Sequence, residues 1–204
     1  MYVGPRLRRT LSRLDSASSA EELRDGLADA AIDMGFPFVA LVQHGGLPRL
    51  IEGTMAITNY PSDFVQFYIT NHCQVYDPIY DVSQRLDRPF DWEEISSFID
   101  LTELQLALFE KARRYGIAHG VTVPLSIPSE SHASCTFATP EPISMTASRM
   151  ATLQIVAAFG FKAALRLHYL SRGTNTPRLT RREAECTALV ALGKSDWEIG
   201  KILG

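Results

Sequence analysis

One short stretch of the chain places nucleophile and base side chains close together. It contains Ser131, His132, Ser134 and Cys135, residue types that hydrolases use for nucleophilic attack. The same stretch has the composition of a strand, and adjacent residues on a strand point to opposite faces of a sheet. Proximity in the sequence is therefore poor evidence for a catalytic group, and we predict that the protein is not an enzyme.

Aromatic and acidic residues in the middle of the chain could instead hold a small molecule. Tyr60, Phe64 and Tyr68 follow at four-residue intervals, which places them on one face of a helix. Asp77 precedes a proline, as helix-starting residues often do, and Trp92 in PFDWEE is large enough to anchor a core. Taken singly, each of these residues indicates buried structure as readily as a binding site.

No sequence pattern indicates a resident metal or cofactor. Glycine-rich phosphate loops and the motifs HExxH, GxSxG and CxxC are absent from the sequence. The five histidines lie at no metal-ligand spacing. Cys73, Cys135 and Cys186 are odd in number and widely spaced, so we predict free thiols rather than a disulfide framework.

Composition limits the class of protein further. The chain has 204 residues, of which 46% are hydrophobic and 21% charged, enough for one well-buried domain and a small appendage. It has no apolar run long enough for a membrane span and no signal peptide at its start. We therefore predict a cytoplasmic protein with no membrane partner.

The charge distribution divides the chain near residue 171. The net charge is −3, but residues 171–204 carry six Lys or Arg against four Asp or Glu. The change coincides with SRGTNTPR, residues 171–178, whose turn-forming and polar residues predict a linker. A second, smaller unit is expected to follow over residues 179–204.

The hydrophobic pattern before the linker predicts helices that alternate with pairs of strands. The helices are expected at 20–34 (capped by Ser19 and Glu22), 61–71, from Asp77, 101–116 (capped by Asp100 and Glu103) and 145–170, and the strands at 36–42, 49–56, 120–126 and 134–138. This order predicts an α+β fold, an α-β-α sandwich with a central antiparallel sheet. The last helix is apolar on more than one face, which predicts a homodimer.

Motifs at both ends of the chain resemble one known family. LTRREAECTALVALGKSDWEIGKILG, residues 179–204, resembles the beginning of the DNA-binding domain of LuxR-type transcription factors. TNYPSDFVQFY, DPIY, PFDW and GVTVPL occur in the order and spacing of that family's autoinducer-binding domain. The resemblance implies a domain for autoinducer binding and dimerisation over residues 1–170, and the N-terminal part of a helix-turn-helix domain over residues 179–204.

The resemblance also implies roles for individual residues around an acyl-homoserine lactone or a related signal. Tyr60 would hydrogen-bond the acyl carbonyl, and Asp77 would accept the amide hydrogen. Trp92 would pack against the lactone ring, Tyr68 would line the pocket, and Thr136 would lie near the acyl head. An empty pocket would leave the Asp77 carboxylate buried without a donor, and the filled form should be the more stable one.

Two positions stand out when the motifs are matched to the family. Gly120 corresponds to a glycine of a family strand. Phe64 occupies a position where the family usually has Trp, whose indole N–H would donate to the lactone carbonyl. Phe has no donor, so the sequence predicts altered recognition of the lactone head group.

The stretch that resembles a DNA-binding domain supplies two helices but no recognition helix. The implied function is a ligand-responsive transcriptional regulator of quorum sensing, which would bind promoter DNA only in a full-length form. The alternative is a truncated antiactivator that sequesters full-length regulators as mixed dimers. Both alternatives remain open at the level of the sequence.

Overall fold

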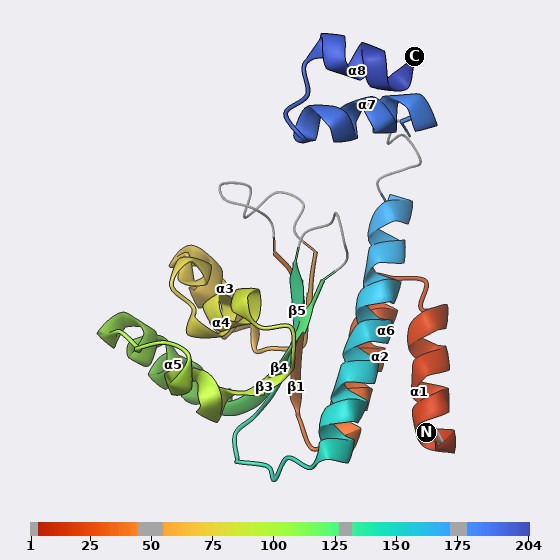
Figure 1. Ribbon diagram of the computed structural model, residues 1–204. Helices are drawn as coiled ribbons and strands as arrows, with labels where there is room; N and C mark the ends of the chain where they lie inside the picture. The colour runs from red at the N-terminus through yellow and green to blue at the C-terminus, as the bar shows by residue number, and fades with distance from the viewer. Residues whose placement is uncertain (1–3, 45–54, 127–131, 172–178) are drawn as a thin grey trace. The chain divides into compact units, whose positions relative to one another are not determined.

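An antiparallel sheet organises the larger of two units in the protein. The computed structural model describes residues 4–44, 55–126, 132–171 and 179–204, and the chain divides into units Met1–His168 and Tyr169–Gly204. The sheet has the strand order β2-β1-β5-β4-β3 and separates two groups of helices, as Figure 1 shows. The predicted α-β-α sandwich is thereby confirmed.

The strands differ in length from the centre of the sheet to its edges. They are β1 (Phe38–Gln43), β2 (Ala56–Thr58), β3 (Phe90–Asp91), β4 (His119–Leu125) and β5 (Ala133–Thr139), and all neighbours are antiparallel. Of the predicted strand at 49–56, residues 49–54 lie outside the described part of the chain, and among the described residues β2 begins at Ala56. The two-residue strand β3 is too short to leave a periodic signal in the sequence.

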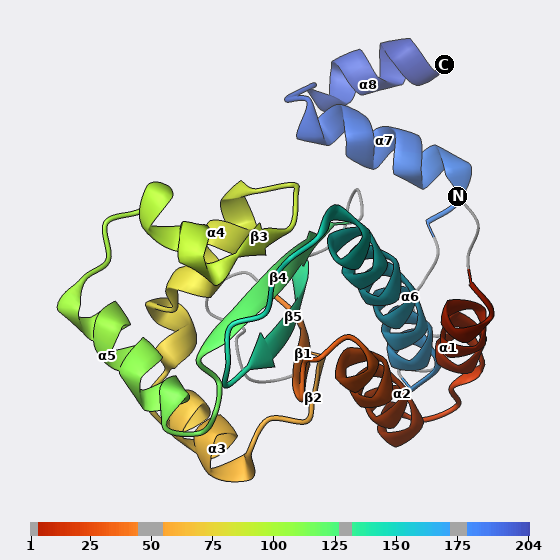
Figure 2. The same cartoon turned by 90° about the horizontal axis from the view of Figure 1, so that it is seen from below.

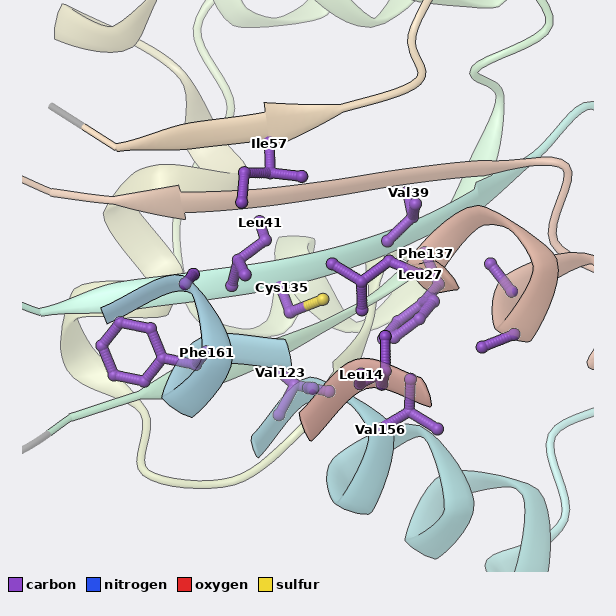
Figure 3. Close-up of a cluster of buried hydrophobic side chains, with 14 of the residues drawn as sticks. Leu14, Leu27, Val39, Leu41, Ile57, Val123, Cys135, Phe137, Val156 and Phe161 are labelled. Atoms are coloured by element: carbon purple, nitrogen blue, oxygen red, sulfur yellow. The ribbon is translucent and has the colours of Figure 1, made fainter. Parts of the chain in front are cut away.

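One face of the sheet is covered by α1 (Pro5–Ser16), α2 (Ala20–Asp33) and α6 (Ala147–Ser171), which lie side by side in Figure 2. Their apolar side chains form the main core with the residues of the strands that point to this face. Figure 3 shows Leu14, Leu27 and Val156 from these helices beside Cys135 and Phe137 of β5.

Much of the apolar surface of α6 is buried against the rest of the chain, although Tyr169 and Leu170 near its end are 51% and 69% exposed. Leu153, Val156 and Phe161 are at most 4% exposed, whereas Gln154, Lys162 and Arg166 are exposed. The helix is long and apolar enough to cross a membrane, yet the core helix of a folded domain has the same character. The sheet, α1 and α2 thus cover part of α6, and the homodimer stays a prediction.

The other face of the sheet carries α3 (Ser62–Thr70), α4 (Pro78–Arg85) and α5 (Glu103–Arg113), with short 3-10 helices at Cys73–Val75 and Trp92–Ser97. Asp77 caps α4, as its place before a proline predicts. The predicted cap of α5 by Asp100 and Glu103 was wrong. Thr102 and Gln105 form the capping box instead, because a Thr/Gln pair three residues apart satisfies the same backbone donors.

Over its described residues 179–204, the smaller unit consists of the helices α7 (Arg181–Ala191) and α8 (Asp196–Leu203). Capping boxes formed by Thr180 with Glu183 and by Ser195 with Glu198 start them. Apart from the backbone of Ser171, the predicted linker at 171–178 lies outside the described residues.

We predict that Leu27→Ala lowers the free energy of unfolding by about 2–5 kcal/mol, because it removes a fully buried side chain from α2 and leaves a cavity. Ile32→Ala on the same helix is the control, since Ile32 is 58% exposed and its truncation should change stability by at most about 0.5 kcal/mol. Urea denaturation of both variants measures the difference, and equal losses would contradict the assignment of this core.

Candidate functional site

A cavity of about 340 Å³ lies between the sheet and the helices α3, α4 and α5. Its volume is in the range of small-molecule sites. The structure brings all six residues of the sequence-predicted site to its lining: Tyr60, Phe64, Tyr68, Asp77, Trp92 and Thr136. These residues come from four separate segments of the chain, which the fold gathers around one space.

Asp77 is the most highly connected polar residue of the cavity. Its Oδ2 accepts a 2.6 Å hydrogen bond from the Tyr68 hydroxyl, and its Oδ1 accepts from the backbone N–H groups of Ile79 at 2.8 Å and Tyr80 at 3.4 Å. Burial raises the pKa of Asp77, and these hydrogen bonds oppose the rise. The expectation that the empty cavity leaves this carboxylate without a donor was therefore wrong, because the protein itself supplies three.

Tyr60 contributes a hydroxyl that has no hydrogen-bond partner among the described residues. Its ring packs edge-on against Phe38, with centroids 6.0 Å apart, and is tilted against Phe64. Burial, with the nearby Asp77 as a smaller cause, raises the pKa of Tyr60. The phenol therefore keeps its proton and offers a hydrogen-bond donor to a molecule in the cavity.

Trp92 is held by a chain of hydrogen bonds that runs from β4 to its neighbour β5. Its Nε1 donates to the Thr122 Oγ1 at 3.0 Å, and that oxygen lies 3.0 Å from the Oγ1 of Thr136. Thr122 and Thr136 are paired neighbours on β4 and β5. Because the indole N–H is already engaged, Trp92 can offer a ligand its ring face rather than a hydrogen bond.

Gly120 makes room for the Trp92 ring. A Cβ atom at this position would lie 2.8 Å from Trp92 Cε2 and 2.7 Å from the carbonyl oxygen of Phe137. Neither neighbour can retreat easily, since one belongs to the backbone of β5 and the other to a hydrogen-bonded ring. The glycine is therefore required for the indole to lie against the sheet.

Phe64 of α3 is surrounded by the rings of three tyrosines. Its centroid is 5.6 Å from that of Tyr115 and 6.1 Å from those of Tyr60 and Tyr68, and it is 5% exposed. Tyr60 and Tyr68 both contact Phe64, but the prediction that the three rings share one helix face was wrong for Tyr60, because α3 begins at Ser62 and only Phe64 and Tyr68 belong to the helix. Phe64 also leaves the cavity without a donor at this position.

A second polar pair in the cavity was not predicted. His44 Nε2 lies 2.9 Å from Ser134 Oγ, and the His44 ring packs against the ring of Tyr80 with centroids 4.6 Å apart. Burial lowers the pKa of His44 to about 4, with a smaller contribution from His132. The sequence shows only a polar residue near the end of β1 and another near the start of β5. Their contact could not be predicted, because the spacing of residues does not reveal which strands pair.

The described nucleophile types of the stretch 131–135 are separated in the structure rather than gathered at one place. Ser131 lies outside the described part of the chain. Ser134 lines the cavity, whereas Cys135 belongs to the core on the opposite face of the sheet. Burial raises the pKa of Cys135, so its thiol stays protonated and unreactive.

Metal binding has no support in the part of the chain that the structure describes, where no three His, Cys, Asp or Glu side chains gather into a possible metal site.

We predict that the free energy of unfolding decreases as the pH falls from 6.5 to about 4. In this range His44 is protonated in the unfolded chain, where its pKa is about 6.5, but stays neutral in the folded protein, where its pKa is about 4. At pH 4.5 the loss from this residue is about 2–3 kcal/mol. The raised pKa of Asp77 acts in the opposite direction, since its protonation relieves a buried charge. His44→Gln should flatten the acid slope in denaturation measured at pH 7 and 4.5; an unchanged slope would contradict the burial of a neutral histidine.

Comparison with known proteins places this chain in a family. A family model described as "Autoinducer binding domain" matches residues 19–164. The protein y4qH of Sinorhizobium fredii is 28% identical over 201 residues, which cover 97% of this chain and 62% of that protein. The transcriptional activator protein AhyR of Aeromonas hydrophila is 25% identical, with 95% of this chain and 76% of that protein covered. The chain thus spans about three fifths to three quarters of the length of these relatives.

A solved structure has the same fold. SdiA in complex with octanoyl-rac-glycerol superposes with a TM-score of 0.76 and 23% identity, covering 100% of this chain and 84% of that one. Because the family model matches more than half of the residues, the chain belongs to the autoinducer-binding-domain family of LuxR-type quorum-sensing regulators.

Proposed function

We propose that the cavity binds an acyl-homoserine lactone or a related acyl signal, and that the chain is the sensing part of a transcriptional regulator. The observation that carries this proposal is the unpaired Tyr60 hydroxyl beside the Asp77 carboxylate in a largely apolar cavity. A buried secondary amide needs one donor and one acceptor. Tyr60 supplies the donor for its carbonyl, and Asp77 supplies the acceptor for its N–H.

The hydrogen bonds already made by Asp77 leave it able to take this role. A carboxylate offers about four lone-pair sites, and the protein occupies three of them. Its bond from Tyr68 and its place at the start of α4 fix the carboxylate before a ligand arrives. Recognition of the amide therefore needs little reorganisation, which favours binding.

The acyl chain would lie against the apolar part of the cavity, whose wall includes Val42, Ile79 and Leu108. The head of the ligand would rest on the face of Trp92 near Thr136. SdiA, which shares the fold, is complexed with octanoyl-rac-glycerol, an acyl ester without a lactone ring. This supports an acyl chain as the common element of the ligands, with a head group that varies.

Ligand binding would control the regulator by stabilising its folded form. A molecule that binds only the folded form stabilises it in proportion to the logarithm of its concentration over its dissociation constant. We propose a cytoplasmic homodimer as the responsive species. Contact with promoter DNA would involve the domain to which α7 and α8 belong. No described residue favours the mixed-dimer antiactivator over this function.

We predict that Asp77→Asn weakens binding of N-octanoyl-homoserine lactone by about 10- to 150-fold, since it removes a charged hydrogen-bond acceptor. Asparagine still caps a helix, so α4 should be retained. Tyr60→Phe should weaken binding by about 2- to 10-fold through loss of one neutral hydrogen bond.

Calorimetry of both variants tests this assignment. Tyr115→Phe is the matched control, because Tyr115 packs on Phe64 but does not line the cavity. Unchanged affinity in Asp77→Asn and Tyr60→Phe would show that the amide is bound elsewhere.

We predict that Phe64→Trp tightens lactone binding by about tenfold if the indole N–H supplies the donor that the lactone carbonyl lacks. The comparison uses N-octanoyl-homoserine lactone and its ring-opened acid, and the gain should be confined to the lactone. Equal gains for both compounds, or a loss through overpacking of the ring group around Phe64, would indicate a cavity shaped for another head group.

A further inference from the structure

The pair Ser134 and His44 lies on the same sheet face as the predicted amide-binding groups but further along it. Ser134 precedes Thr136 by two residues on β5, so both side chains point into the cavity, about 7 Å apart along the strand. His44 directly follows β1 and donates its backbone N–H to the carbonyl of His132 at 2.6 Å. The fold thus places the imidazole beside Ser134.

Tyr80 connects this pair to the amide-binding end. Its backbone N–H contacts Asp77 Oδ1 at 3.4 Å, and its ring lies against the ring of His44. Asp77, Tyr80, His44 and Ser134 all line the same cavity. A ligand whose amide is held by Asp77 therefore needs to extend past one tyrosine side chain to reach the pair.

The pair has hydrogen-bonding capacity left over. A neutral imidazole has one donor and one acceptor, and a serine hydroxyl has one donor and two lone pairs. The described residues show one hydrogen bond between the two side chains and none to the other ring nitrogen of His44. Whichever atom donates, Ser134 keeps at least one site that a ligand can use.

From this geometry we propose, on the basis of the proposed function, that Ser134 and His44 form a specificity-determining subsite for an oxygen atom on the distal part of the acyl chain. A plain alkyl chain would cover the pair and leave its remaining capacity unpaired, which is unfavourable in an apolar cavity. A hydroxyl or carbonyl oxygen at that depth would use the capacity. The cavity thus selects an oxygenated acyl chain over an unsubstituted one of the same length.

The test compares three probes by calorimetry: N-octanoyl-, N-(3-hydroxyoctanoyl)- and N-(7-hydroxyoctanoyl)-homoserine lactone. For each protein, the affinity of a hydroxylated probe is divided by that of the octanoyl probe. The ratio for the 7-hydroxy probe should fall about five- to tenfold in Ser134→Ala and in His44→Phe. The ratio for the 3-hydroxy probe should change less than about twofold, since its oxygen stays at the amide end.

Two further variants separate this role from a loss of folding. Ser134→Thr keeps the hydroxyl and should restore the ratio for the 7-hydroxy probe. Ser83→Ala removes a buried serine hydroxyl that donates to the Tyr80 carbonyl outside the cavity lining, and it should leave the ratio unchanged.

The outcomes distinguish the two proposals. If N-octanoyl-homoserine lactone binds but the ratios are the same in the wild type and Ser134→Ala, the subsite is refuted and the proposed function stands. If none of the three lactones binds the wild type, the proposed function fails and the subsite fails with it.

Discussion

The carboxylate of Asp77 is the constraint on which the cavity depends. It begins α4 through the N–H groups of Ile79 and Tyr80, and it holds Tyr68 of α3 through one strong hydrogen bond. A charge in an apolar interior is tolerated only when it is compensated in this way. The same interactions that stabilise the carboxylate therefore fix the positions of two helices that form the wall of the cavity.

The sheet provides two different interiors because side chains alternate along each strand. On β5, Ser134 and Thr136 face the cavity, whereas Cys135 and Phe137 face the core under α2 and α6. One side is closely packed and fixes the fold. The other side leaves a space with a few placed polar groups, which is the usual composition of a small-molecule site.

Much of this arrangement could be predicted from the sequence, because its signals are local. The helix that carries Phe64 and Tyr68 and the helix start marked by Asp77 and its following proline are elements that the structure confirms. Interactions between distant segments left no such signal. The link from Trp92 through Thr122 to Thr136, and the pairing of His44 with Ser134, depend on strand register. Register is set by the whole sheet rather than by any one segment.

The lengths of the strands have a consequence for how the protein behaves at high concentration. Among the described residues, the edge strands β2 and β3 have three and two residues, whereas the three central strands have six or seven. Long exposed edges invite other chains to add strands and polymerise, and very short edges offer few free backbone groups for this. A fold that keeps an open cavity beside its sheet is thus protected against fibril formation by the short strands at both edges of that sheet.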